Sequence, residues 1–430
     1  MDYILLFVGI IMMYRRNYAW MFAIIIILSS TYLQLPLDDN MQLKVGPNHN
    51  VADIGLLLYL LYFFKEVIQH GFYIKNPMRK SIALFLSFLF LNGVFDYFKG
   101  TSLGDVIRYW KDWAFLSIVF INPYIYQKEF LKIFKIIFWI TAVLCAVLIV
   151  QYALGVVWIG FSTKYFSHGV EYVRGVKPPS TVIICVVIAL VNLFNFSKSI
   201  QIMVLAVLML PILLTLKMSY FGTLLLCASI YYWFYKKQNF IFIIKYSFIA
   251  ILFLLVVSIS FPVFTQRFTE TINQSSLFIN KSKEKGNFSY RIDHFKERFD
   301  YVLQDPVRSI RGIGYIQERN FHHKIFKLGQ HNDYKDVVQL DTGDIAWSIL
   351  ILRLGILGLI VYGSMYFYCM GYIFRQRESS TIILLLFAYM FASFFFMSMG
   401  NTLIANSEFF ILPLLSIQLL DNTNSVLKYT

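Results

Sequence analysis

Apolar stretches recur along almost the whole 430-residue chain, separated by polar segments that are mostly short. Most stretches hold about 17–25 residues, the length that an α-helix needs to cross roughly 30 Å of hydrocarbon. The pattern predicts an all-α, polytopic membrane protein with about 12 or 13 transmembrane helices, because the first stretch is short enough to leave the number open. The predicted spans are residues 2–14, 17–34, 51–68, 81–97, 103–122, 133–153, 178–196, 200–216, 218–235, 239–260, 343–369, 379–398 and 403–420.

One polar segment is much longer than the others and divides the chain. We expect N-terminal transmembrane helices in residues 1–260, a large loop in 261–342 and C-terminal transmembrane helices in 343–430. Loops of this length are usually either functional or disordered.

The large loop contains a helical pattern, which predicts that it is partly helical and ordered. Pro306 is expected to end this helix, and Gly312-Ile313-Gly314 to form a turn. The apolar residues expected on one face of the helix are Ile292, Phe295, Phe299 and Val302.

The charge of the short loops gives the chain a direction across the membrane. One alternate set is rich in lysine and arginine, and the positive-inside rule assigns it to the cytoplasm. The opposite set is poorer in these residues and includes Asp38 and Asp39. The large loop therefore lies outside and the C-terminus inside. The cations of the cytoplasmic set are Arg15, Arg16, Arg79, Lys80, Lys128, Lys132, Lys135, Lys198, Lys236, Lys237, Arg375 and Arg377.

Composition excludes a water-soluble fold. Charged residues make up 14% of the chain, whereas soluble proteins contain about a quarter. The formal net charge of +14 favours anionic partners. Because this charge is spread over both sides of the membrane, lipid headgroups and phosphate-bearing substrates fit better than nucleic acid.

The first group of candidate functional residues lies at the outer end of the span at 178–196. Arg174 and Lys177 precede Pro178-Pro179 there. An arginine offers a rigid fork of N–H donors that matches phosphate oxygens. The alternative is that both cations only extend to the membrane interface.

The second group lies in the large loop, where Arg291 is near the start of the expected helix. His294 and Phe295 follow on the same face. This face is a candidate wall of a cleft that binds an anion. The alternative is a solvated helix face, which is the usual meaning of charges in an exposed loop.

The third group lies where the span at 343–369 begins. Asp341 and Asp344 are at its outer end, and Arg353 is inside it. A carboxylate here is a candidate general base, with capping of the helix start as the competing role. An ionisable residue at membrane depth usually faces a cavity or a partner.

Two features are weaker. Arg108 shares a helix face with Asp105 and Asp112, and this face either lines an outer cavity or pairs Arg108 with Asp112. The loop histidines, His331 among them, have no companion carboxylates at regular metal-ligand spacing, so no metal site is expected.

Together these groups resemble the superfamily of O-antigen polymerases and O-antigen ligases, which are multi-span bacterial membrane enzymes. The family carries an Arg-Gly-Pro segment before a span, and a loop arginine followed by a P-x-x-G-x-G stretch. It ends on a polar residue followed by Gly-Ile-x-Gly-Leu. The similar segments here are Arg174-Gly175 with Pro178-Pro179, Arg291 with Pro306 and Gly312-x-Gly314, and Asp344 with Gly355-Ile-Leu-Gly358-Leu359.

Two segments depart from the family pattern. Ligases usually carry a His-Asn pair where this chain has Gly343-Asp344, and the aspartate is more similar to the polymerase branch. The family's Thr-x-Ser-Arg segment at a middle span is replaced by a stretch with Lys217, a cation that lacks the bidentate fork.

The resemblance implies a metal-independent, inverting glycosyltransferase that needs no cofactor. A sugar hydroxyl would attack the anomeric carbon of a glycan linked to undecaprenyl pyrophosphate. Arg174 and Arg291 are expected to stabilise the leaving pyrophosphate, and Asp344 to act as the base. The residues expected to bind substrate around them are Lys177, Arg311, His294, Asp341, His331, Lys217 and Arg108.

The resemblance also implies partners and a location. These are the lipid-linked glycan, membrane lipids and a chain-length regulator protein, at the bacterial inner membrane, in lipopolysaccharide O-antigen synthesis, with the site facing the periplasm. A ligase that transfers the glycan to lipid A core or to a protein is the alternative within the family. A lipid-glycan flippase is the alternative from another class, but it usually has two similar halves and helices broken at the bilayer midplane, and the sequence predicts neither.

Overall fold

The computed structural model describes most of the predicted membrane helices and part of the large loop. The described residues are 2–29, 51–74, 77–121, 129–154, 163–167, 170–174, 178–179, 181–215, 218–235, 287–316, 321, 325–329, 331–332, 337–338, 340, 345–378 and 381–397. The elements in chain order are α1 (Asp2–Tyr14), α2 (Tyr18–Ser29), α3 (Val51–His70), α4 (Pro77–Phe98), α5 (Leu103–Trp110), the 3₁₀ helix η1 (Lys111–Phe120), α6 (Phe130–Leu154), β1 (Thr163–Ser167), β2 (Val170–Arg174), α7 (Val182–Val191), α8 (Lys198–Thr215), α9 (Met218–Tyr235), α12 (Asn287–Leu303), α13 (Pro306–Arg311), β3 (His331–Asn332), β4 (Val337–Val338), α14 (Ala346–Arg375) and α15 (Thr381–Met397).

The all-α prediction is confirmed in outline. Each predicted span that falls on described residues coincides with a helix, whereas the spans at 239–260 and 403–420 lie outside the described residues. Among the described helices, three are long and apolar enough to cross a membrane, which indicates a multi-pass membrane protein. They are Pro77–Phe98, Leu131–Leu154 and Ala346–Arg375.

Two short antiparallel hairpins, β1–β2 and β3–β4, add to the helices and were not predicted. In the first hairpin Thr163 is opposite Arg174. Helix α7 is shorter than the predicted span at 178–196. It ends because Asn192 takes the left-handed conformation, with φ of 54°.

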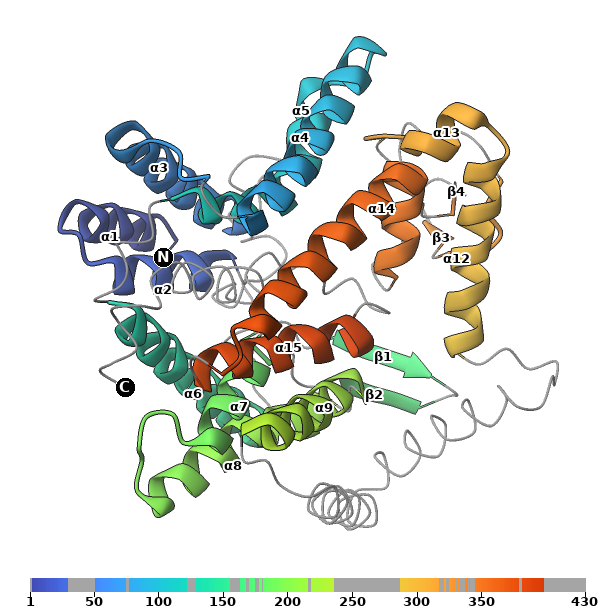
Figure 1. Cartoon of the computed structure of the whole chain (residues 1–430). Coiled ribbons are helices and arrows are strands. Elements are labelled where there is room, and N and C mark those ends of the chain that lie inside the picture. The colour runs from blue at the N-terminus through green and yellow to red at the C-terminus, as the bar shows by residue number, and fades with distance from the viewer. Residues whose placement is uncertain are drawn as a thin grey trace.

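The helices pack in pairs that are distant in sequence (Figure 1). α9 packs on α15, α4 on α14 and α6 on α8. Three buried rings join α4, η1 and α14: Phe85 lies 5.0 Å from Trp113 and 5.5 Å from Tyr362, edge to face. This contact holds α4 beside α14, the two helices on which the loop rests.

The loop helix α12 forms as predicted, but with a different buried face. Ile292 is 42% exposed, while His294, Arg298, Tyr301 and Val302 are buried. Val302 belongs to the predicted apolar face, but the apolar pattern did not predict the burial of His294 and Arg298, whose side chains form hydrogen bonds. α12 ends before Pro306, which instead begins α13, with Asp305 as the N-cap that accepts a hydrogen bond from the Arg308 amide (2.8 Å).

Helix α14 is broken at Gly355, although one continuous span was predicted. The φ of 66° and ψ of −168° at this residue lie far from helical values, and glycine adopts such a conformation readily. Figure 1 shows α14 changing direction beside α13. Its first residues run along α12, and its longer remainder runs away from the loop.

The backbones of the loop and of α14 touch at this break. A Cβ atom on Gly355 would lie 2.5 Å from both the Gly312 nitrogen and the Ile310 oxygen. A Cβ atom on Gly312, where φ is also positive at 72°, would lie 2.5 Å from the Leu352 oxygen. Both positions therefore require glycine.

We predict that Gly355→Ala destabilises the protein. The new methyl group meets backbone atoms that cannot move aside, and alanine at a positive φ adds roughly 1–3 kcal/mol of strain. The thermal midpoint of the detergent-solubilised protein should fall by several degrees.

The control is Gly363→Ala in the same helix, where a Cβ atom meets nothing within 4 Å. Its midpoint should match or slightly exceed that of the unmodified protein. An equal loss in both variants would contradict the close approach at Gly355.

Candidate functional site

The candidate site is built where the large loop rests on the membrane helices. α12 and α13 both pack against α14. Two contacts fix how α12 lies along α14: His294 meets Ser348, and further along both helices Val302 and Leu352 share one apolar cluster. α12 and the first part of α14 therefore run in the same direction.

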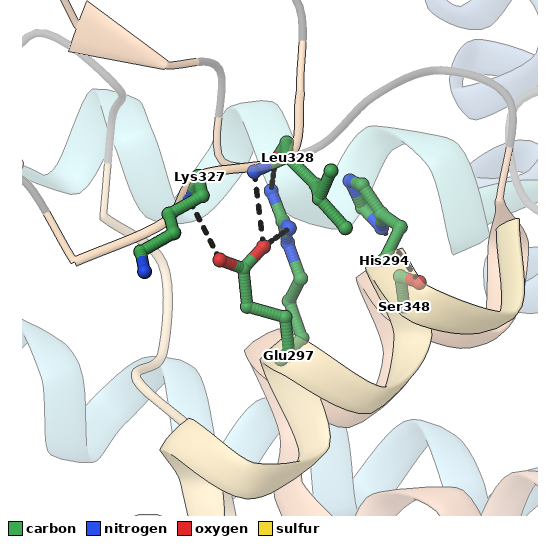
Figure 2. Close-up of polar contacts among 6 residues, drawn as sticks. His294, Glu297, Lys327, Leu328 and Ser348 are labelled. Carbon is green, nitrogen blue, oxygen red and sulfur yellow. Dashed lines mark hydrogen bonds and ion pairs between the residues drawn. The ribbon is translucent and has the colours of Figure 1, made fainter. Parts of the chain in front are cut away.

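His294 and Ser348 form the hydrogen bond at the first of these contacts (Figure 2). The Nδ1 and Oγ atoms are 3.0 Å apart, and both residues are buried. Burial, together with the positive charge of Arg298, lowers the pKa of His294 to about 3. The imidazole is therefore neutral at physiological pH.

Arg298, one helical turn after His294, is fully buried. It donates to the Glu297 carboxylate (2.7 Å) and to the Leu328 carbonyl oxygen (2.5 Å), and its guanidinium carbon lies 4.4 Å from the centre of the Phe326 ring. Glu297 in turn accepts from the backbone amides of Lys327 (2.6 Å) and Leu328 (Figure 2). This network holds the loop residues Phe326–Leu328 against α12.

The predicted turn at Gly312–Gly314 is confirmed. It lies against the break in α14 and forms hydrogen bonds with the residues just before Gly355. The Ile313 amide donates to the Leu352 carbonyl oxygen (2.8 Å), and the Gly314 amide donates to that of Arg353 (3.2 Å). The Arg353 guanidinium donates back to the carbonyl oxygens of Gly314 (3.3 Å) and Ile316. The charge of Arg353 is thus enclosed by loop backbone, and the expectation that it faces a partner is confirmed.

Asp96, near the end of α4, holds the other side of the turn. Its carboxylate is buried, forms an ion pair with Arg311 and accepts from the Tyr315 amide (3.0 Å). Gly314 leaves no room between the turn and this carboxylate, because a Cβ atom there would overlap it. The Arg311 guanidinium also stacks 4.0 Å from the Phe95 ring centre, and burial lowers the pKa of Arg311.

Arg291 lies at the opposite end of the loop structure from Arg311. It is half-buried in α12, three residues before His294. From Arg291 to Leu303 the helix extends about 18 Å, and α13 with Arg311 follows. Arg291 therefore lies toward the start of α14, while Arg311 lies at the break.

The other predicted site residues are described only in part. The backbones of Arg174, Arg108 and His331 end β2, form part of α5 and begin β3, respectively. The expected pairing of Arg108 with Asp112 presumed a continuous α-helix, but the 3₁₀ helix η1 begins at Lys111. Four of the predicted site residues lie outside the described residues: Lys177, Lys217, Asp341 and Asp344.

The sequence analysis missed Asp96, Arg298 and Ser348. Asp96 had a usable signal, since a carboxylate inside an apolar stretch usually has a partner. Ser348 had none, because a serine in a membrane helix has many roles. Among the described residues, no group of three or more histidine, cysteine, aspartate or glutamate side chains is arranged to hold a metal ion.

No family model, curated protein or solved structure matches this chain. The resemblance in its motifs therefore stays a prediction.

We predict that Asp96→Asn lowers the free energy of unfolding by about 1–3 kcal/mol, the cost of leaving a charged hydrogen-bonding group without its partner. The substitution removes the counter-charge of the half-buried Arg311 guanidinium. Unfolding of the purified protein in mixed detergent micelles would measure the change.

Asp53→Asn is the matched control. Asp53 also forms an ion pair, with Lys111 at 2.8 Å, but both side chains are about a quarter exposed. Exposed pairs contribute less than about 1 kcal/mol. Equal losses in the two variants would refute an anchoring role for Asp96.

We also predict that stability decreases as the pH falls below about 6.5, through His294. An unfolded histidine titrates near 6.5, whereas His294 in the folded protein stays neutral down to about pH 3. Between these values the unfolded state binds the extra proton, so His294 contributes most above pH 6.5 and loses up to about 1.4 kcal/mol per pH unit below it.

His294→Asn removes the titrating group and keeps a polar side chain. The variant should be less stable at pH 7 but should lose less stability between pH 7 and pH 5 than the unmodified protein. Parallel pH profiles of the two proteins would show that His294 does not cause the dependence.

Proposed function

We propose that this protein is a metal-independent, inverting membrane glycosyltransferase. It polymerises oligosaccharide repeat units linked to undecaprenyl pyrophosphate, at the outer face of the bacterial inner membrane. The observation that carries this proposal is the anchoring of α12, with Arg291 and His294, along the first residues of α14. Because the two helices run in the same direction, Arg291 lies toward the N-terminal end of α14. In the sequence, Asp344 stands two residues before that helix begins.

The chemistry needs a cation and a base on opposite sides of the reacting carbon. Negative charge builds on the pyrophosphate as it leaves, and a fixed guanidinium stabilises this charge more in the transition state than in the bound substrate. Arg291 and Arg174 take this role, helped by Lys177, which follows Arg174 by three residues in the sequence. Asp344 accepts the proton of the attacking sugar hydroxyl, with Asp341 or His331 as the substitute.

The fixed loop supports an enzyme over a flippase. Backbone hydrogen bonds and the ion pair of the buried Asp96 with Arg311 hold residues 311–315 of the loop on two membrane helices. A loop held in this way keeps catalytic groups in a constant geometry. Two large substrates can be positioned for reaction only when that geometry is constant.

The finer topology belongs to the same proposal. The chain crosses the membrane about 12 or 13 times, with residues 261–342 outside. Shorter apolar helices occur in addition to the three long ones, which supports more than three crossings. The cations of alternate short loops support the orientation, with those loops in the cytoplasm. The lipid-linked glycan reaches the site from the outer leaflet, and a chain-length regulator acts as a further partner.

We predict that Arg174→Ala, Arg291→Ala and Asp344→Asn each reduce polymer formation by roughly 10²–10³-fold or more, the effect of losing one preorganised stabilising group. Arg291→Lys should also be poor, because a point charge does not replace the bidentate fork. The measurement is extension of purified lipid-linked repeat units by detergent-solubilised protein, without any ion gradient.

Lys296→Ala is the matched control, since Lys296 is an exposed cation on the same helix. It should form polymer at the normal rate. Full-length polymer from all three variants would refute the assigned roles. Glycan transfer only to an added lipid A core or protein acceptor would identify a ligase instead.

A further inference from the structure

We propose that only the part of α14 after Gly355 crosses the lipid bilayer. The preceding residues, Ala346–Leu354, belong to the extracytoplasmic structure, and the outer edge of the hydrocarbon lies close to Gly355. The outer side of this boundary rests on the proposed orientation, with residues 261–342 outside, whereas the boundary itself does not depend on the proposed enzymatic activity.

The length of α14 is the first argument. The element has 30 residues, and an unbroken helix of that size would be about 45 Å long, against roughly 30 Å of hydrocarbon. From Ile356 to Arg375 the helix extends about 30 Å. The second part alone therefore matches the bilayer.

Exposure of the side chains changes at the break. From Ile345 to Gly355 every residue is buried except Trp347, which is half-buried. Protein, and not lipid, therefore covers this part, and α12 and α13 pack there. After the break, one stripe at helical spacing is exposed and mostly apolar. Its members are Leu357, Ile360, Ser364, Phe367 and Tyr368.

This stripe fits the acyl chains of lipids. Leu357, Ile360 and Phe367 are 43%, 58% and 53% exposed. A row of large exposed apolar side chains is unfavourable in water and favourable in hydrocarbon. Arg375 and Arg377 at the far end of α14 are the cations expected at a cytoplasmic boundary.

Arg353 and the turn that encloses it also favour a boundary close to Gly355. A guanidinium at the bilayer centre costs at least about 2.5–3.5 kcal/mol. Irregular backbone such as Gly312–Ile316 is tolerated at membrane depth only where protein or a water-filled cavity covers it, and Ile313 and Ile316 are only half-buried. Both costs are avoided when Arg353 and the turn lie outside the hydrocarbon.

Site-directed spin labelling tests this boundary. Leu357→Cys, Ile360→Cys and Ser364→Cys are each labelled in the full chain, after the four buried native cysteines are replaced by alanine. The protein is reconstituted into phosphatidylcholine bilayers. Collision of the label with oxygen and with a water-soluble nickel complex then gives its immersion depth.

With the boundary at Gly355, Leu357 lies about 3 Å, Ile360 about 7 Å and Ser364 about 13 Å below the hydrocarbon edge. Depth should therefore increase in that order, with the Ser364 label closest to the bilayer centre. Phe367→Cys, expected to be nearly as deep as Ser364, replaces any variant that does not elute as monodisperse protein.

The opposite order would overturn the inference. If the whole element spanned the membrane, its midpoint would lie next to Ile360, which would be the deepest of the three positions, with Leu357 and Ser364 each about 5 Å from the midplane. If Gly355 were instead a helix break at the bilayer midplane, the arrangement typical of transporters, Leu357 would be the deepest position and Ser364 the shallowest. Equal depths at the three positions would also overturn it.

Discussion

The regular helical hydrogen bonds of α14 are interrupted at Gly355, and backbone amides of the loop replace them. The amides of Ile313 and Gly314 donate to the carbonyl oxygens of Leu352 and Arg353. Backbone groups buried without partners cost several kcal/mol in an apolar setting, so neither the break nor the turn is stable without the other. These hydrogen bonds between the turn and α14 fix the position of α13, and α13 in turn fixes that of α12.

Polar contacts secure the rest of the loop, and its apolar core is small. That core holds Tyr301, Val302, Phe321, Phe326, Leu340 and Leu352. Three arginines of this region make polar contacts: the buried Arg298 with Glu297, the half-buried Arg311 with Asp96, and the buried Arg353 with loop carbonyl oxygens. Such contacts are directional, so they specify one arrangement of the loop on the helices more tightly than apolar packing of the same size.

Hydropathy predicted the described membrane helices because burial in lipid depends on local composition. It did not predict the break, since a glycine in an apolar stretch such as Leu354-Gly355-Ile356 is compatible with a continuous helix. The requirement for glycine appears only in the folded chain, where backbone atoms of Ile310 and Gly312 occupy the space of a Cβ atom and φ is positive.

The same limit applies to the candidate site. A rule that buries apolar residues cannot foresee that His294 and Arg298 are buried, because their partners, Ser348 and Leu328, lie 54 and 30 residues away. The helix that carries Arg291 and the glycine turn were predicted from the sequence, since helical spacing and paired glycines are informative on their own. The β1–β2 hairpin that carries Arg174 was not, because its strands are only five residues long.

The Asp96–Tyr315 contact has a consequence for biosynthesis. These residues are 219 positions apart, which corresponds to about 10–40 s of translation. During that interval the Asp96 carboxylate has neither Arg311 nor the Tyr315 amide, so α4 must hold this charge in water or headgroups at the membrane edge. Several later helices are made before the loop arrives. The helices of the newly made chain therefore reach their final packing only after the large loop has been made and Arg311 pairs with the Asp96 carboxylate.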